Sequence, residues 1–217
     1  MKTYHVNSIP TKQLIITGKG ASHLWDDANV LNDFSSPWED LKDTKTTFRA
    51  LWDDDYLFFC FHVFDDAIHI DNTDTGFNSI NVSDRVEFFF RVNASLNPYY
   101  CLEIDPTPRI MDFKALPNKD FNFDWDWPKQ DLVVNSNMNS KGFSVEGKIS
   151  LASLKSLNLI HDLTIETGIF RATYYKTKEL TYKPTWITWV DPKTDAPNFH
   201  TPSSFGTLKL EKNSFSI

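Results

Sequence analysis

Apolar and polar residues alternate with a two-residue period along several short runs, which is the pattern of β-strands. The clearest runs are 46–52 and 56–64, which are joined by three aspartates and are therefore predicted to form a hairpin. The second run is apolar on both of its faces. One face carries Leu57, Phe59, Phe61 and Val63, and the other carries Phe58, Cys60, His62 and Phe64. The second face is therefore either covered by other segments or a binding surface.

Further strand-like runs separated by turn residues follow along the rest of the chain. They cover 86–92, 99–105, 132–137, 143–149, 168–176, 185–190 and 206–210. The helical patterns are short: 151–157, with Ser150 as N-cap, and a weaker turn within 22–30. No linker or repeat divides residues 1–217, so we expect a single domain. The fold class we predict is all-β: an immunoglobulin-like or jelly-roll-like antiparallel β-sandwich with at most one or two short helices.

Composition narrows the possible partners. Aromatic residues make up 15% of the chain, which favours a β-rich core, and the formal net charge is −7. An acidic surface argues against nucleic acid as a partner. No apolar run of about 18 residues is present, so we expect no membrane span. The first residues lack the apolar stretch of a signal peptide, which leaves a cytoplasmic location open.

The two cysteines, Cys60 and Cys101, have no C-x-x-C spacing and are too few for a disulfide scaffold. They fall on the second and fourth predicted strands. If the strands lie side by side in sequence order, the two residues are roughly 9–10 Å apart. A disulfide needs Cα atoms closer than about 7 Å. We therefore predict two free thiols.

Six short motifs follow one another over nearly the whole chain. They are Ile16-Thr17-Gly18 with Trp25, the segment Arg49–Leu57, the segment Ser83–Phe89, Gly142–Glu146 with Ile149–Leu151, the segment Phe170–Lys176, and Thr188–Pro192 with Phe199–Gly206. In this order they resemble the family 9 carbohydrate-binding modules and their DOMON-like relatives. The resemblance implies a β-sandwich that binds a polysaccharide or oligosaccharide through aromatic rings and polar side chains and is not an enzyme. It also implies an extracellular or periplasmic location, possible structural calcium, and a glycoside hydrolase acting on the same polysaccharide as a partner.

The resemblance also implies a place for the ligand. Sugar-binding relatives clamp a terminal sugar between two tryptophans; here those positions hold Phe199 and, approximately, Asn81, and an arginine that they use on strand 99–105 has no counterpart. Glu87 is retained. We expect a shallow site where the strand carrying Asp84, Arg85 and Glu87 meets the loop carrying Asn198 and Phe199.

Two more groups of side chains are candidates. Trp125 and Trp127, with Phe121 and Phe123, would share one side of an extended segment; this row is either a sugar platform or a loop that caps one end of the sandwich. On the predicted strand 168–176, Arg171 is expected to pair with a buried acid such as Glu146.

The sequence gives weaker indications of calcium binding, haem binding or enzymatic activity. Aspartates at the predicted hairpin turns between 53 and 74 are candidate calcium ligands, although no EF-hand spacing is present, and solvated turns explain most of them. A haem-binding DOMON-type electron-transfer domain is the main alternative function, with Met111 and Met138 as available ligands. A glycoside-active enzyme stays open as well, because catalytic carboxylates are paired in space and not in sequence.

Overall fold

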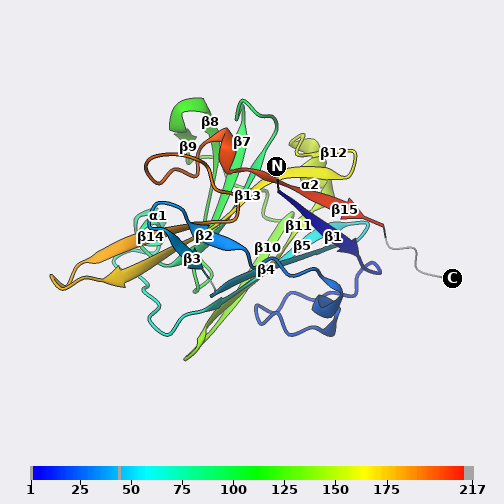
Figure 1. The fold of residues 1–217 in the computed structure, drawn as a ribbon. Helices are drawn as coiled ribbons and strands as arrows, with labels where there is room; N and C mark the ends of the chain where they lie inside the picture. The colour runs from blue at the N-terminus through cyan, green and yellow to red at the C-terminus, as the bar shows by residue number, and fades with distance from the viewer. Residues whose placement is uncertain (1, 44, 213–217) are drawn as a thin grey trace.

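The computed structural model describes residues 2–43 and 45–212, and within them strands dominate (Figure 1). The strands are β1 (Thr3–Ser8), β2 (Phe34–Ser36), β3 (Leu41–Asp43), β4 (Thr46–Trp52), β5 (Tyr56–Phe64), β6 (Arg85–Arg91), β7 (Tyr99–Ile104), β8 (Ile110–Leu116), β9 (Asp120–Asn122), β10 (Leu132–Asn139), β11 (Gly142–Ser150), β12 (Ile160–His161), β13 (Thr164–Lys176), β14 (Tyr182–Thr188) and β15 (Gly206–Glu211). Two α-helices, α1 (Phe77–Asn81) and α2 (Leu151–Ser156), are short, as are the 3₁₀ turns His23–Asp27, Pro117–Lys119 and Pro202–Ser204. The all-β prediction is confirmed.

The strands form one continuous sheet that curls over on itself into a sandwich. Its order is β10-β11-β5-β4-β1-β15-β13-β6-β7-β8-β9, and the far end of β13 carries β14 as a second neighbour. Most pairs are antiparallel, as predicted, but β1 runs parallel to both β4 and β15. β1 therefore joins the two layers of the sandwich, and the sheet is mixed because of it.

The core between the layers is rich in phenylalanine. Phe48, Phe59, Phe61 and Phe88 are each fully buried, and their rings meet edge to face at 4.9–5.5 Å. The two-residue period of β5 and β6 places Val86, Phe88 and Phe90 on the inner face of β6. The intervening residues of β6 therefore point to the outer face of the sandwich.

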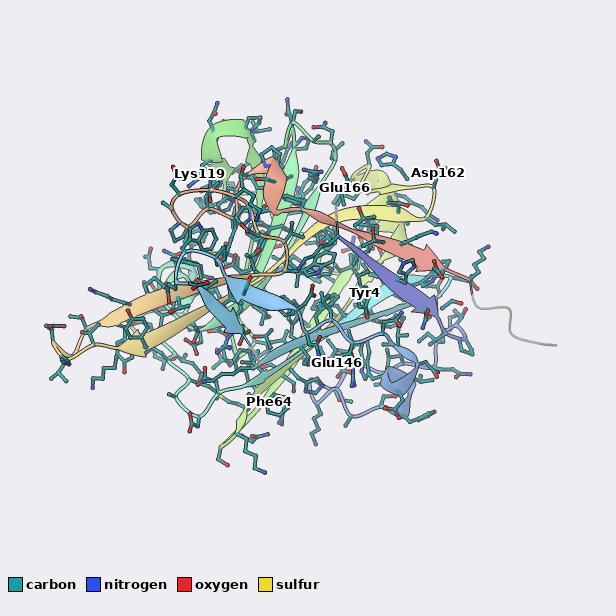
Figure 2. All side chains as sticks on the ribbon, in the orientation of Figure 1. Tyr4, Phe64, Lys119, Glu146, Asp162 and Glu166 are labelled. Atoms are coloured by element: carbon teal, nitrogen blue, oxygen red, sulfur yellow. The ribbon has the colours of Figure 1, made fainter. Side chains whose placement is uncertain are left out.

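The first half of the second apolar face of β5 is covered. Trp25, Leu14 and Leu24, from the segment between β1 and β2, pack against Phe58 and Cys60. Trp25 Nε1 also donates a 2.8 Å hydrogen bond to Glu146 in β11. Glu146, labelled in Figure 2, further accepts bonds from the backbone N–H groups of Thr17 and Gly18. Phe58 and Cys60 are therefore closed to a ligand, whereas Phe64, at the end of the strand, stays 60% exposed.

Arg171 does pair with a buried acid, as predicted, but that acid is not Glu146. Arg171 lies on β13 and pairs with Asp65, at the end of β5. Glu146 instead anchors the N-terminal segment, because its carboxylate sits where that segment turns its N–H groups inward.

Both cysteines are free and buried, as predicted. The reason differs from the one expected, because β5 and β7 are not near neighbours in the sheet. Cys60 packs under the N-terminal segment, whereas Cys101 packs in a separate outer cluster with Phe89 and Phe113. In the described part of the chain, no helix is long and apolar enough to cross a membrane.

Candidate functional site

A pocket of about 320 Å³ opens on the outer face of β6, β7 and β8. The loop between β14 and β15, helix α1 and the segment around β9 form its walls. We name it the Glu87 pocket. Its lining residues are Phe77, Asn81, Arg85, Glu87, Glu103, Met111, Phe113, Lys119, Phe121, Phe123, Trp186, Pro197, Asn198, Phe199 and His200.

Strand register decides which side chains meet on the pocket floor. Glu87 in β6 lies directly opposite Glu103 in β7 and Phe170 in β13. Arg85 lies two residues before Glu87 and therefore projects from the same face. Across β13, Ala172 pairs with both Arg85 and Trp186, so Trp186 reaches the same face from β14.

The floor is a buried group of two acids and one base. Arg85 Nε lies 2.7 Å from Glu103 Oε2 and 3.0 Å from Glu87 Oε1, and all three residues are at most 4% exposed. Arg85 also donates through a terminal nitrogen to the carbonyl of Asn81. Glu87 Oε1 has no hydrogen-bond partner of acceptable geometry although it is buried.

Burial and the neighbouring acid raise the pKa of Glu87 to about 8, and Arg85 only partly offsets them. Burial likewise raises the pKa of Glu103. One arginine cannot balance two buried carboxylates, so at neutral pH the pair holds one proton between them. Burial lowers the pKa of His200 to about 3, which keeps its ring neutral. The floor therefore combines hydrogen-bond donors and acceptors with no net charge.

Aromatic rings form the walls. Phe199 stacks on Phe170 with a centroid distance of 4.1 Å and meets Trp186 edge to face at 5.6 Å. The Arg85 guanidinium lies 5.5 Å from the centroid of Trp186. Phe77 and Phe123, whose rings meet at 4.1 Å, are the exposed rings of the opposite wall. Rings beside planar polar groups suit a sugar, which has apolar C–H faces and an equatorial rim of hydroxyls.

The rim is polar. Asn198 Oδ1 accepts a bond from the backbone N–H of His200, which orders the loop that carries Phe199. His200 Nδ1 lies 3.1 Å from the hydroxyl of Tyr99. Lys119, labelled in Figure 2, supplies a cation at the turn between β8 and β9.

Four of the seven residues predicted from the sequence meet in this pocket. They are Arg85, Glu87, Asn198 and Phe199. Phe199 is only 5% exposed, so the part of its ring that faces the pocket is small.

Asp84 lies outside the pocket. It is fully buried and accepts a hydrogen bond from the backbone N–H of Tyr174. Burial raises the pKa of its carboxyl to about 7. Asp84 therefore links the start of β6 to β13 and is not in reach of a ligand in this pocket.

Trp125 and Trp127 also lie outside it. Trp127 packs against Phe90 and donates to Ser153 Oγ, and Trp125 packs against Tyr100 on the inner side of the sheet. The predicted row of four rings is split because the chain turns at Asp124, whose N–H donates to Asn122 Oδ1. Phe121 and Phe123, before the turn, line the pocket, so the segment does contribute rings, but not its tryptophans.

The sequence interpretation missed several lining residues. Glu103 was detectable, because strands 86–92 and 99–105 read as neighbours and a hairpin register would place it opposite Glu87. Trp186 and Phe77 had no comparable signal, since their positions depend on the pairing of β14 and on helix α1.

The aspartates considered for calcium act mostly as turn acceptors. Asp53 accepts from the N–H groups of Asp55 and Tyr56, Asp71 accepts from Thr73, and Asp74 accepts from Gly76. Among residues 2–43 and 45–212, no three His, Cys, Asp or Glu side chains are grouped so that they could hold a metal ion. Calcium binding stays a prediction from the resemblance.

Comparison with known proteins decides the family. The sequence profile described as "Carbohydrate family 9 binding domain-like" matches residues 16–213, which is nearly the whole chain. The chain belongs to this family. It is thus a non-catalytic carbohydrate-binding module, as the sequence motifs predicted.

Solved structures agree on the fold. A family 9 carbohydrate-binding module of Caldicellulosiruptor kristjanssonii, solved with glucose and with cellotriose, is 17% and 16% identical in the two structures, each with a TM-score of 0.62. The alignments cover 100% of this chain and 99% and 97% of those chains. A protein of Bacteroides uniformis ATCC 8492, classed only provisionally as carbohydrate-binding, is 15% identical with a TM-score of 0.73, over 97% of this chain and 99% of that one. A comparison with curated proteins finds no match.

Proposed function

We propose that the Glu87 pocket is the carbohydrate site of this module and that it takes one neutral hexose unit at a time. The observation that carries the proposal is the buried Arg85–Glu87–Glu103 group, which lies on the floor of a pocket walled by rings. A volume of about 320 Å³ suits one pyranose ring and not a long stretch of chain.

The chemistry of the floor favours a neutral ligand. Arg85 supplies donors, while Glu87 and Glu103 supply acceptors and one shared proton. Adjacent hydroxyls of a sugar can pair with both kinds of group, whereas an added charge would upset the balance of buried charges. Trp186 and Phe199 on one wall and Phe77 and Phe123 on the other would cover the apolar faces of the sugar. The related module of C. kristjanssonii was solved with glucose and cellotriose, which makes these two sugars the first probes.

Titration calorimetry with glucose and cellotriose tests the proposal. We expect saturable binding by the wild type and a loss of about 1–3 kcal/mol, or roughly five- to 150-fold in affinity, in Glu87→Gln. Glu166→Gln is the matched control, because Glu166 also pairs with an arginine of β6, Arg91, but lies outside the pocket. Equal loss in both variants, or no loss in Glu87→Gln, would place the site elsewhere.

We further propose that the module works outside the cytoplasm beside a glycoside hydrolase that acts on the same polysaccharide. Membership of the family supports this proposal. Fractionation of the source cells and co-purification with hydrolase activity would test it.

A further inference from the structure

A second cavity lies on the opposite face of the strands that border the Glu87 pocket. Its volume is about 640 Å³, and we name it the Arg171 cavity. Side-chain alternation along β14 separates the two: Trp186 lines the Glu87 pocket, while Thr185 and Ile187 line the Arg171 cavity. On the neighbouring strand β13, Arg171, Thr173 and Tyr175 also line the cavity.

The floor of the cavity is a buried ion group with bonds left unmade. Arg171 is 1% exposed and pairs with Asp65 through a terminal nitrogen, while its other terminal nitrogen lies 4.0 Å from Asp43 Oδ1. Arg171 Nε and Asp43 Oδ2 are both buried without a hydrogen-bond partner. A buried donor and a buried acceptor left unpaired are costly, so this ion group gains free energy if its side chains turn toward a hydroxyl-bearing ligand in the cavity.

The charges of the lining nearly cancel. Arg171, Lys45 and Lys176 contribute three positive charges, and Asp43 and Asp65 contribute two negative charges, with Lys45 Nζ 3.7 Å from Asp65 Oδ1. An added ammonium group would therefore be disfavoured, whereas a neutral polyol would leave the balance as it is.

The cavity mouth carries exposed aromatic rings. Tyr175 is 53% exposed and Tyr182 is 43% exposed. Tyr182 stacks on His69 with the centroids 3.5 Å apart and the planes 16° apart, which fixes the orientation of its ring. Ile68 and Ile187 add an apolar wall. Two tyrosines at the mouth, an apolar wall and a polar floor are what a pyranose ring requires.

We propose that the Arg171 cavity is a second carbohydrate site that binds a pyranose independently of the Glu87 pocket. The two sites open on opposite faces of one sheet, so a single module would hold two glycan strands. Such bivalency raises the avidity for a dense polysaccharide surface above that of either site alone.

Backbone amide resonances of ¹⁵N-labelled protein test this, with glucose, galactose, mannose, xylose and cellotriose as the probes. We expect at least one of these sugars to shift the amides of Thr173 and Tyr175 in a saturable way. The shift should persist in Glu87→Gln, which disables only the first pocket. In Tyr175→Ala the affinity at these amides should fall roughly tenfold, because half of a stacking platform is lost.

Leu180→Ala is the matched control, because Leu180 is exposed at the tip of the same hairpin and does not line the cavity. It should leave the shift unchanged. The proposal is overturned if none of the five sugars moves Thr173 and Tyr175, or if Tyr175→Ala binds as the wild type does. Sugar binding in the Glu87 pocket is measured separately, by the indole N–H resonance of Trp186. The two proposals can therefore fail independently.

Discussion

Replacing Glu87 by glutamine should change how the stability of the protein depends on pH. The pKa of Glu87 is raised from the ordinary 4.5 to about 8 in the folded protein. Between these values the folded state binds more protons than the unfolded state, so the stability that this group contributes is present below pH 4.5 and is lost as the pH rises towards 8. Glutamine keeps the shape of the side chain and cannot titrate.

The size of the effect follows from the number of protons involved. One proton bound by the folded but not by the unfolded state gives a limiting slope of about 1.4 kcal/mol per pH unit. Between pH 5.5 and 7.5, the wild type should therefore lose up to about 3 kcal/mol more than Glu87→Gln, and less where Glu103 takes part of the proton. The pKa of Asp84 is also raised, to about 7, so the stability that Asp84 contributes also falls as the pH rises. This fall is the same in both proteins and cancels in the comparison.

Urea unfolding at pH 5.5, 6.5 and 7.5 measures this difference, with Glu166→Gln as the control that keeps the buried acids intact. The stability of the wild type should approach and then fall below that of Glu87→Gln as the pH rises. Parallel pH dependence in the wild type and Glu87→Gln would mean that Glu87 is ionised in the folded protein, and the shared-proton description of the pocket floor would be wrong.

Three further outcomes are expected. Phe199→Leu should weaken cellotriose binding three- to tenfold in calorimetry while the protein stays folded by circular dichroism, because a flat ring is lost and most of the apolar volume is kept; unchanged affinity would remove Phe199 from the site. Trp127→Ala should cost about 3–5 kcal/mol of stability in urea, since a fully buried ring is deleted, and should leave the cellotriose affinity of the folded fraction unaltered; a selective loss of binding would reinstate this residue as a ligand contact. A thiol reagent should label Cys60 and Cys101 only after denaturation, because burial raises the pKa of both thiols; rapid labelling of the native protein would contradict their burial.

Most strands of the sheet could be predicted because each is marked by a local sequence pattern. The runs 46–52 and 56–64 match β4 and β5 residue for residue, since the Asp53–Asp55 turn and the alternating phenylalanines mark both ends. β1 was missed, and with it the parallel pairing that joins the two layers. Thr3–Ser8 is short, and its partners Leu51 and Leu208 lie far away along the chain.

The site was predictable only where it follows one strand. Arg85 and Glu87 were correctly placed together because alternation along β6 puts them on one face. Trp125 and Trp127 were grouped with Phe121 by the same rule, which does not hold across the turn at Asp124. Trp186 could not be found, because its place beside Arg85 depends on how β14 pairs with β13.

The most direct test of the central claim is to follow the indole N–H resonance of Trp186 while glucose or cellotriose is added, with Trp186→Phe used to assign the signal. Trp186 lines the Glu87 pocket and lies against Arg85, so a sugar bound there must change its surroundings. The account predicts a saturable shift of this resonance and of the Phe199 amide with one common binding curve, and in Glu87→Gln a curve moved roughly five- to 150-fold to higher sugar concentration. Sugar binding that leaves both resonances in place, or no binding of either sugar, would contradict it.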